Sequence, residues 1–361
     1  MKSVGLIIFV FALALVGCDS RQKVSISPAE EVITYSGRID HSAMDKVDLY
    51  WPGSSVRVDF EGDSLFAWLH DEKGANYFNI IIDNDSVRTL RLDSVSRRYL
   101  LAAGLPAGTH SVELFKRTEW DKGKTTFQGF ELSGSQIAVS KSQPRSRKME
   151  FYGNSITAGY GVDDTSGQDR PDSIYTNHYA SYASLVARHF EADFHSICKS
   201  GIGIMISWFP MIMPEMYDRL IPEDTASRWD FAQYKPEVVV VNLMQNDSWL
   251  IERPEYEQFK ARFGKSKPTD EEIALAYRTF IQSIREKYPM AQIVCLLGNM
   301  DITQEGSSWP EYVKQAITGL EDNQIYSHVV PYKKTAGHPN RAEQMALAKS
   351  LISFIEENIK W

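Results

Sequence analysis

The residues best suited to chemistry begin with a serine in a glycine-flanked turn, within the stretch 151–161 of sequence FYGNSITAGYG. The preceding residues 149–152 are expected to form a short strand. A serine held in a strand-to-helix turn presents its hydroxyl beside backbone N–H groups that can bind an oxyanion. We therefore predict Ser155 as a nucleophile, with an incidental serine in a glycine-rich turn as the alternative. The G-x-S-x-G elbow of the α/β-hydrolases is absent from the chain.

Three later segments carry the other groups that such a nucleophile needs. Asn246 follows the apolar run 238–243, and its side-chain amide can donate to an oxyanion. Gly201 follows another expected strand and offers a backbone N–H, whereas His338 precedes the last helical pattern and can serve as a base. Each of these residues by itself is as readily a turn former or a structural residue, so the prediction depends on their occurring together.

These four blocks, in this order, resemble the SGNH hydrolase superfamily, also called GDSL-type esterases. The resemblance covers the chain from about Lys148 to the C-terminus. It implies that Ser155 is the nucleophile and His338 the general base and acid. It also implies an oxyanion hole formed by the backbone N–H groups of Ser155 and Gly201 with the side chain of Asn246.

Taken with an N-terminal β-rich region, residues 155–161 and 200–203 look like those of carbohydrate esterase family two. That resemblance implies a jelly-roll domain joined to a hydrolase domain. It implies removal of O-acetyl groups from xylan, mannan or a similar plant-wall polysaccharide, with no cofactor. The implied partner is an acetylated polysaccharide or oligosaccharide.

Two positions depart from the superfamily pattern. Asn154 stands where Asp is usual, and we expect this change to be tolerated because that residue is structural. Thr335 stands where an Asp three residues before the histidine orients and stabilises the imidazolium. Some members of family two lack this Asp as well, so we expect a Ser–His dyad whose histidine is held by a backbone carbonyl. Asp301, after the strand-like run 292–297, is the alternative.

Aromatic residues make up 12% of the chain and include 8 Trp and 17 Tyr. Near the expected catalytic loops, Trp309, Trp249 and Tyr160 are the candidates for stacking on a sugar ring, with Trp208 a further possibility. Packing in the core or between loops is the alternative for each. Composition does not separate the two uses.

The elements that must position these groups divide the chain in two. Residues 29–140 show short alternating segments separated by turns, which predict a β-sandwich of the jelly-roll type. Val56, Val58 and Phe60 are expected on one face of a strand. The polar, basic segment 141–148 is predicted to be a linker between domains.

Residues 149–361 alternate strand and helix patterns and predict a doubly wound α/β domain with a parallel sheet, the SGNH hydrolase fold. The runs 238–243 and 292–297 are the expected buried strands. Two helices are expected from apolar spacing, and their marker residues are Ile273, Tyr277, Phe280 and Ile284 in the first and Met345, Ile352, Ile355 and Ile359 in the second. Asn340 with Glu343 forms the expected capping box of the last helix.

The first 18 residues are predicted to be a targeting segment. Lys2 precedes an apolar run too short to span a membrane, and the segment ends in small residues before Cys18. This resembles a bacterial lipoprotein processing site, so Cys18 is the expected lipidation site, the only membrane contact, with residues 19–28 as a tether. An ordinary secretory signal is the alternative, and both export the chain.

Composition restricts the remaining possibilities. The 361 residues are 43% hydrophobic and 24% charged, with a formal net charge of −8, which argues against a nucleic-acid partner. Cys198 and Cys295 are expected as buried free thiols, and the absence of a CxxC or HxH pair argues against structural zinc. Two other functions stay open: an esterase acting on another acyl ester, and a carbohydrate-binding surface lipoprotein whose catalytic domain has decayed.

Overall fold

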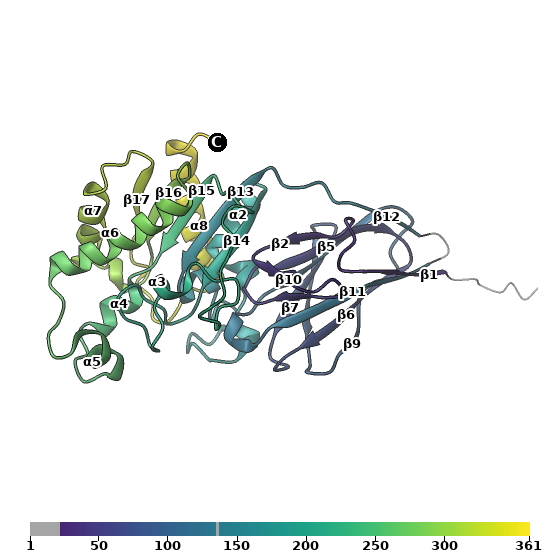
Figure 1. Ribbon diagram of the computed structural model, residues 1–361, viewed down its shortest axis with the longest axis horizontal. Helices are drawn as coiled ribbons and strands as arrows, with labels where there is room; N and C mark the ends of the chain where they lie inside the picture. Colours follow the sequence, from purple (N-terminus) through teal and green to yellow (C-terminus); the bar gives the residue numbers. More distant parts are fainter. Residues whose placement is uncertain (1–21, 135–136) are drawn as a thin grey trace, which may run out of the picture.

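The computed structural model describes residues 22–134 and 137–361. An antiparallel β-sandwich occupies the N-terminal part, and a parallel sheet with helices occupies the C-terminal part (Figure 1). The predicted fold class is thus confirmed. The expected targeting segment and Cys18 lie outside the described residues. Among the residues described, no helix is both long enough and apolar enough to cross a membrane.

The sandwich consists of two antiparallel sheets. One has the strand order β3-β4-β11-β6-β9, with β1 also paired to β11. Its strands are β1 (Gln22–Ile26), β3 (Ile39–Asp40), β4 (Val47–Leu49), β6 (Ser64–Asp71), β9 (Arg97–Ala103) and β11 (Thr125–Gly134). The other has the order β12-β5-β10-β7-β8, with β2 paired to β5. Its strands are β2 (Thr34–Ser36), β5 (Ser55–Glu61), β7 (Tyr77–Ile82), β8 (Ser86–Arg91), β10 (His110–Lys116) and β12 (Ala138–Ser140).

Alternation along the strands builds the core of the sandwich. Val56, Val58 and Phe60 of β5 are fully buried, as their spacing predicted. Residues 22–26, by contrast, were expected to belong to a tether but form β1, which pairs with the end of β11 from Gln22↔Gly134 to Ile26↔Phe130. Val24 and Ile26 lie opposite Leu132 and Phe130, so this short segment has apolar partners that the sequence did not indicate.

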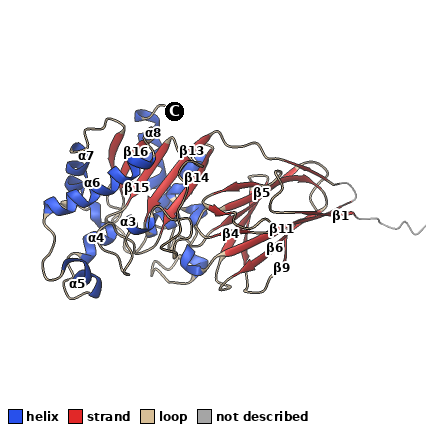
Figure 2. Ribbon diagram, in the orientation of Figure 1, coloured by secondary structure: helices blue, strands red, loops and turns tan. Residues whose placement is uncertain are grey.

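The C-terminal sheet is parallel and has the order β14-β13-β15-β16-β17. Its strands are β13 (Arg147–Gly153), β14 (Ala192–Cys198), β15 (Val238–Asn242), β16 (Gln292–Leu297) and β17 (Ile325–Val329). The helices around it are α1 (Ser155–Ala158), α2 (Tyr182–His189), α3 (Met213–Met216), α4 (Gln245–Leu250), α5 (Glu257–Phe263), α6 (Asp270–Lys287), α7 (Trp309–Thr318) and α8 (Arg341–Asn358) (Figure 2). Because β13 begins at Arg147, the last two residues of the predicted linker belong to the sheet.

Both faces of this sheet are covered. Val239 and Val241 of β15 pack in one cluster with residues of α6 and α7, whereas Val238 and Val240 pack in another with residues of α2 and α8. This is why the strand is a continuous valine run. The four predicted apolar residues of α6 are all buried, and Thr269 and Glu272 cap its N-terminus.

The last helix starts where predicted, and all but one of its predicted apolar residues pack on the core. Asn340 accepts the N–H groups of Ala342 and Glu343, and Glu343 accepts the N–H of Asn340, so the capping box is present. Of the four marker residues, Ile355 and Ile359 are buried and Ile352 packs against the same cluster, whereas Met345 is 39% exposed. Leu347 and Leu351 of the helix are buried against the sheet as well. Cys198 and Cys295 are buried free thiols, as predicted.

Candidate active site

Ser155 lies at the tip of the turn that leaves β13. Gly153 ends the strand, and a Cβ built there would lie 1.9 Å from Thr157 Oγ1, so the turn admits no side chain at this position. Asn154 caps α1 by accepting the Ile156 N–H with its side-chain oxygen. This capping explains how Asn can replace the usual Asp here, since either oxygen can accept the bond. Ser155 itself is only 6% exposed.

His338 reaches this serine from the loop before α8. Its Nε2 lies 2.8 Å from Ser155 Oγ, the distance of a hydrogen bond, although 183 residues separate them. The structure therefore brings together the two residues predicted to be the nucleophile and the base. The ring of Tyr160 contacts the imidazole edge to face, with centroids 4.9 Å apart.

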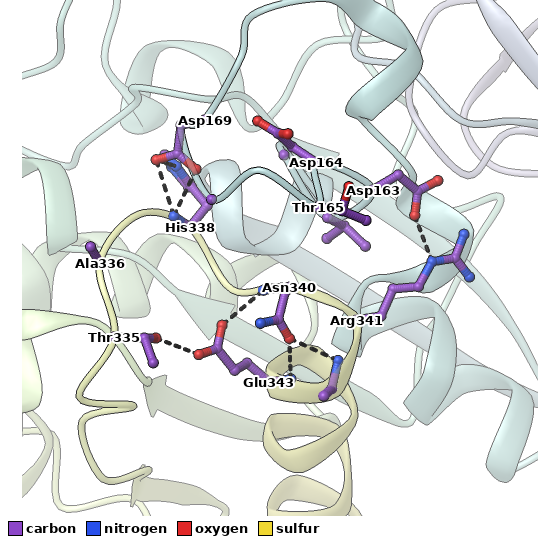
Figure 3. A pocket seen from close by; sticks show the side chains of 14 residues that line it. Asp163, Asp164, Thr165, Asp169, Thr335, Ala336, His338, Asn340, Arg341 and Glu343 are labelled. Carbon is purple, nitrogen blue, oxygen red and sulfur yellow. Dashed lines mark hydrogen bonds and ion pairs between the residues drawn. The ribbon is translucent and has the colours of Figure 1, made fainter.

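The expected Ser–His dyad is wrong, because a third residue contacts the histidine. Asp169 Oδ2 lies 2.8 Å from His338 Nδ1, and the carboxylate also accepts the His338 backbone N–H (Figure 3). Burial tends to raise the pKa of Asp169, but the bonds and charge of His338 outweigh burial and lower it. Asp169 thus holds the imidazole by its Nδ1 side and leaves Nε2 for the serine, which is the geometry of a Ser-His-Asp triad.

Sequence reasoning missed Asp169 because no local signal distinguishes it. It lies in a loop after the nucleophile that also contains Asp163 and Asp164, and all three look like solvated loop residues. One structural sign is its backbone φ of +54°, a left-handed conformation that is uncommon outside glycine.

The two positions considered for this role hold other partners. Thr335 Oγ1 donates to Glu343 and accepts from Lys333 Nζ. Asp301, the alternative acid, accepts hydrogen bonds from Gln245 Nε2 at 2.8 Å and from Trp249 Nε1 at 2.7 Å. Neither residue is hydrogen-bonded to His338, so Asp301, the alternative to the dyad, does not orient the imidazole.

The predicted oxyanion donors follow three neighbouring strands. Gly153 of β13 is in register with Cys198 of β14 and with Asn242 of β15, so the chain leaves all three strands at one edge of the sheet. Within residues 22–134 and 137–361, the backbone N–H groups of Ser155 and Gly201 donate to no protein acceptor. Both are therefore available to a ligand oxygen.

Asn246 is fixed by two hydrogen bonds. Its Nδ2 donates to Ile202 O at 2.8 Å, and its Oδ1 accepts from Trp208 Nε1 at 3.1 Å. Because an amide nitrogen carries two hydrogens, one remains to donate. Trp208, a weaker candidate for sugar stacking, thus orients the Asn246 side chain while remaining 37% exposed.

Asp247 anchors the loop that follows Gly201. Its carboxylate accepts the backbone N–H groups of Ile204, Met205 and Ile206. Burial raises the pKa of Asp247 to about 6, although these hydrogen bonds oppose the rise. The turn into α4 is itself strained, with φ of +76° at Met244. Asn246 is therefore a candidate oxyanion donor, and its neighbour Asp247 anchors the loop after Gly201.

The aromatic candidates lie in or beside hollows near this edge. Trp249 and Trp309 line a cavity of about 360 Å³ together with Asp301. A smaller cavity of about 190 Å³ shares Trp249 and Asp301 and reaches Gly337, next to the histidine. A third hollow of about 710 Å³ lies on the Asp169 side of His338 and is lined by Asp163, Asp164, Arg341 and Glu343 among others (Figure 3). In the part of the chain that the structure describes, no group of His, Cys, Asp or Glu is arranged to hold a metal ion.

This fold and site belong to a known class. The family model described as GDSL-like Lipase/Acylhydrolase family matches residues 151–332, half of the chain, and the chain belongs to that family. That description names lipases and acylhydrolases, the enzyme class that the geometry of Ser155, His338 and Asp169 fits. The model described as Carbohydrate esterase 2 N-terminal matches residues 35–140. The combination of the two confirms the predicted resemblance to family-two carbohydrate esterases.

Individual relatives share the two-part architecture. The chain is 30% identical over 343 residues to "Cellulase/esterase CelE" of Acetivibrio thermocellus, covering 91% of this chain and 40% of that longer protein. It is 23% identical to an "Acetylxylan esterase / glucomannan deacetylase" of Cellvibrio japonicus, with 96% of each chain covered. A family two carbohydrate esterase from Clostridium thermocellum, solved in complex with cellohexaose, superimposes with a TM-score of 0.79 at 30% identity, covering 90% of this chain and 98% of that one.

Proposed function

We propose that this protein is an exported carbohydrate O-acetyl esterase that deacetylates plant-wall polysaccharide through Ser155, His338 and Asp169. The observation that carries the proposal is the chain of two hydrogen bonds, each 2.8 Å long, from Ser155 Oγ to His338 and from His338 to Asp169. Relatives named as acetylxylan esterase and glucomannan deacetylase support the substrate class. The targeting segment and Cys18 are the support for export and for a lipid anchor.

In the proposed reaction, His338 Nε2 takes the Ser155 proton as Oγ attacks the acetyl carbonyl carbon. Asp169 stabilises the imidazolium that forms and keeps its tautomer. The N–H groups of Ser155 and Gly201, with Asn246 Nδ2, stabilise the tetrahedral oxyanion, and each such donor is worth about 3 kcal/mol. His338 then protonates the departing sugar oxygen and, in the second half, activates the water that releases acetate.

The sugar chain is proposed to lie along the two cavities that share Trp249 and Asp301, of which the smaller reaches Gly337. Trp249 and Trp309 offer ring faces there, and Tyr160 borders the histidine on its other side. The Asp301 carboxylate accepts the Trp249 indole N–H and so fixes the orientation of that ring. A fixed indole can stack on a pyranose without first losing rotamer freedom.

The decayed-enzyme alternative depended on the missing acid before His338. Because Asp169 supplies a carboxylate at Nδ1, that support is lost. An esterase for a different acyl group remains the second candidate. Comparing polysaccharide and small-ester substrates distinguishes it from a polysaccharide deacetylase.

The test is acetate release from acetylated xylan, acetylated glucomannan and 4-nitrophenyl acetate by wild type and Ser155→Ala. We expect release from a polysaccharide by the wild type and a loss of about 10⁴-fold or more in kcat in the variant, whose fold should be unchanged. Serine-dependent activity on the small ester alone would favour the other acyl substrate. Turnover close to wild type in Ser155→Ala would refute the assignment altogether.

A further inference from the structure

The turn that carries the Gly201 N–H is held by a side chain from the other domain. Glu119 lies in the sandwich, between β10 and β11, and is 2% exposed. Its carboxylate accepts the backbone N–H of Ser200 at 2.5 Å and the Ser200 hydroxyl at 2.6 Å. Both donors belong to the residue directly before Gly201.

Neighbouring groups hold this carboxylate in place. Lys199 Nζ lies 3.6 Å from Glu119 and 3.0 Å from Asp121, and Lys116 Nζ donates to the Glu119 carbonyl at 3.3 Å. The next residue, Trp120, packs in the same cluster as Ile197 and Ile202, which flank the turn. Glu119 is thus a fixed, charge-compensated acceptor rather than a mobile surface carboxylate.

Other bonds hold the residues on either side of Ser200, but the Ser200 N–H and hydroxyl are both bonded to Glu119. Gly201 has φ of +84°, and the backbone bonds around it run from Lys199 N–H to Gly153 O, from Ile202 N–H to Lys199 O and from Trp208 N–H to Gly201 O. Two bonds from one carboxylate to Ser200 fix the plane of the 199–200 peptide and the direction in which the chain enters Gly201. Since donors in an oxyanion hole act only within a few tenths of an ångström of their position, this orientation affects rate more than substrate binding.

We infer that Glu119 is a positioning residue for the oxyanion hole, so that the sandwich domain completes the active site of the hydrolase domain. The inference rests on the proposed function, because it assigns Gly201 as an oxyanion donor. It goes beyond that function by giving the N-terminal domain a part in catalysis.

A purely structural contact between domains is the competing explanation, and the chain offers a matched control. Ser36 of the sandwich donates its hydroxyl to Asp193 Oδ1 and to Phe194 O, near the start of β14. This contact crosses the same interface at the opposite end of that strand from Ser200. Ser36→Ala therefore removes comparable contacts between the domains without touching the turn.

The experiment uses the full chain and the variants Glu119→Gln, Ser200→Ala, their double variant and Ser36→Ala. For 4-nitrophenyl acetate we expect kcat to fall 10- to 100-fold in Glu119→Gln with KM within about twofold, and to fall several-fold in Ser200→Ala. The double variant should be no slower than Glu119→Gln, because both changes disrupt the same Glu119–Ser200 interaction. Phenylboronic acid, which forms a tetrahedral adduct with the serine, should bind more weakly in proportion to kcat/KM.

Ser36→Ala should retain wild-type kcat even if its melting temperature falls. If Glu119→Gln and Ser200→Ala keep wild-type kcat and boronate affinity, the inference is overturned. Should Glu119→Gln fail to fold, unchanged kcat in Ser200→Ala overturns it by itself. A wild type without serine-dependent turnover would instead refute the proposed function, so the two failures are distinct.

Discussion

At the scale of single residues, the charge behind the catalytic histidine comes from an unexpected place. The carboxylate needs only to reach Nδ1, and the segment from which it comes does not affect the electrostatics. Asp169 meets that need from the loop after the nucleophile, while Thr335 occupies the usual position and bonds elsewhere. The imidazole thus has a carboxylate partner at Nδ1, as in a triad, but that carboxylate comes from a different segment of the chain.

Asp169→Asn should lower kcat about 10²- to 10⁴-fold, since Asn keeps the shape but not the charge that stabilises the imidazolium. Steady-state kinetics on 4-nitrophenyl acetate would measure the loss. Asp172 is an exposed residue of the same segment, so Asp172→Asn is the control and should leave kcat unchanged. Full activity in Asp169→Asn together with a gain in Thr335→Asp would show that the charge acts from position 335 instead.

At the scale of elements, the loop between β14 and α3 depends on the first turn of α4. The Asp247 carboxylate accepts three successive backbone N–H groups, those of residues 204–206. Gly203 lies so close to it that a Cβ there would be 2.6 Å from Asp247 Oδ2. The loop that follows Gly201 is thus fixed to the same helix that carries Asn246. The oxyanion donor Asn246 and the loop anchor Asp247 are therefore adjacent residues of one short helix.

The raised pKa of Asp247 predicts a particular pH dependence of stability. Its pKa is about 6 in the folded state and about 4 in the unfolded chain, so the folded state binds the extra proton between these values. The contribution of this group to the free energy of unfolding should therefore be greatest below about pH 4 and fall as the pH rises to about 6.

Urea unfolding of wild type and Asp247→Asn between pH 4 and pH 8 would check this, because the variant lacks the titrating group. The stability of wild type relative to the variant should decrease toward pH 6 and then level off. A difference that stays flat, or grows with pH, would contradict a raised pKa.

At the scale of the whole molecule, the two domains are joined by a buried ion pair. Arg38 of the sandwich donates to Glu150 of β13 at 2.5 Å, and both side chains are fully buried. Arg38 also donates to the carbonyls of Tyr217 and Arg219 in the hydrolase domain. Burial would lower the pKa of Arg38, but Glu150 and the neighbouring tyrosines raise it, so the guanidinium stays charged.

Arg38→Met should destabilise the protein by about 3–5 kcal/mol, because it leaves the Glu150 carboxylate buried without a cation. Calorimetry should show one transition at a lower temperature, and Glu150→Gln in the same background should recover part of the loss. Two separated transitions, with the hydrolase domain melting as in wild type, would show instead that the domains are thermally independent.

The sequence by itself determined what depends on local pattern. Alternation along β5, the valine run of β15 and the capping box at Asn340 each follow from residues close together in the chain, and all are present. Ser155 and His338 were also found, because each stands in a glycine-containing turn at the end of a recognisable element.

Tertiary structure alone decided which distant groups meet. Asp169, which meets His338, and Glu119, which meets Ser200, show no local signature, because an isolated carboxylate in a loop looks the same whether it is solvated or holds a catalytic group. Packing against the sheet likewise decided that Met345 of α8 is exposed whereas Ile355 is buried. Local periodicity determines which elements form, but contacts across more than 80 residues depend on how those elements pack.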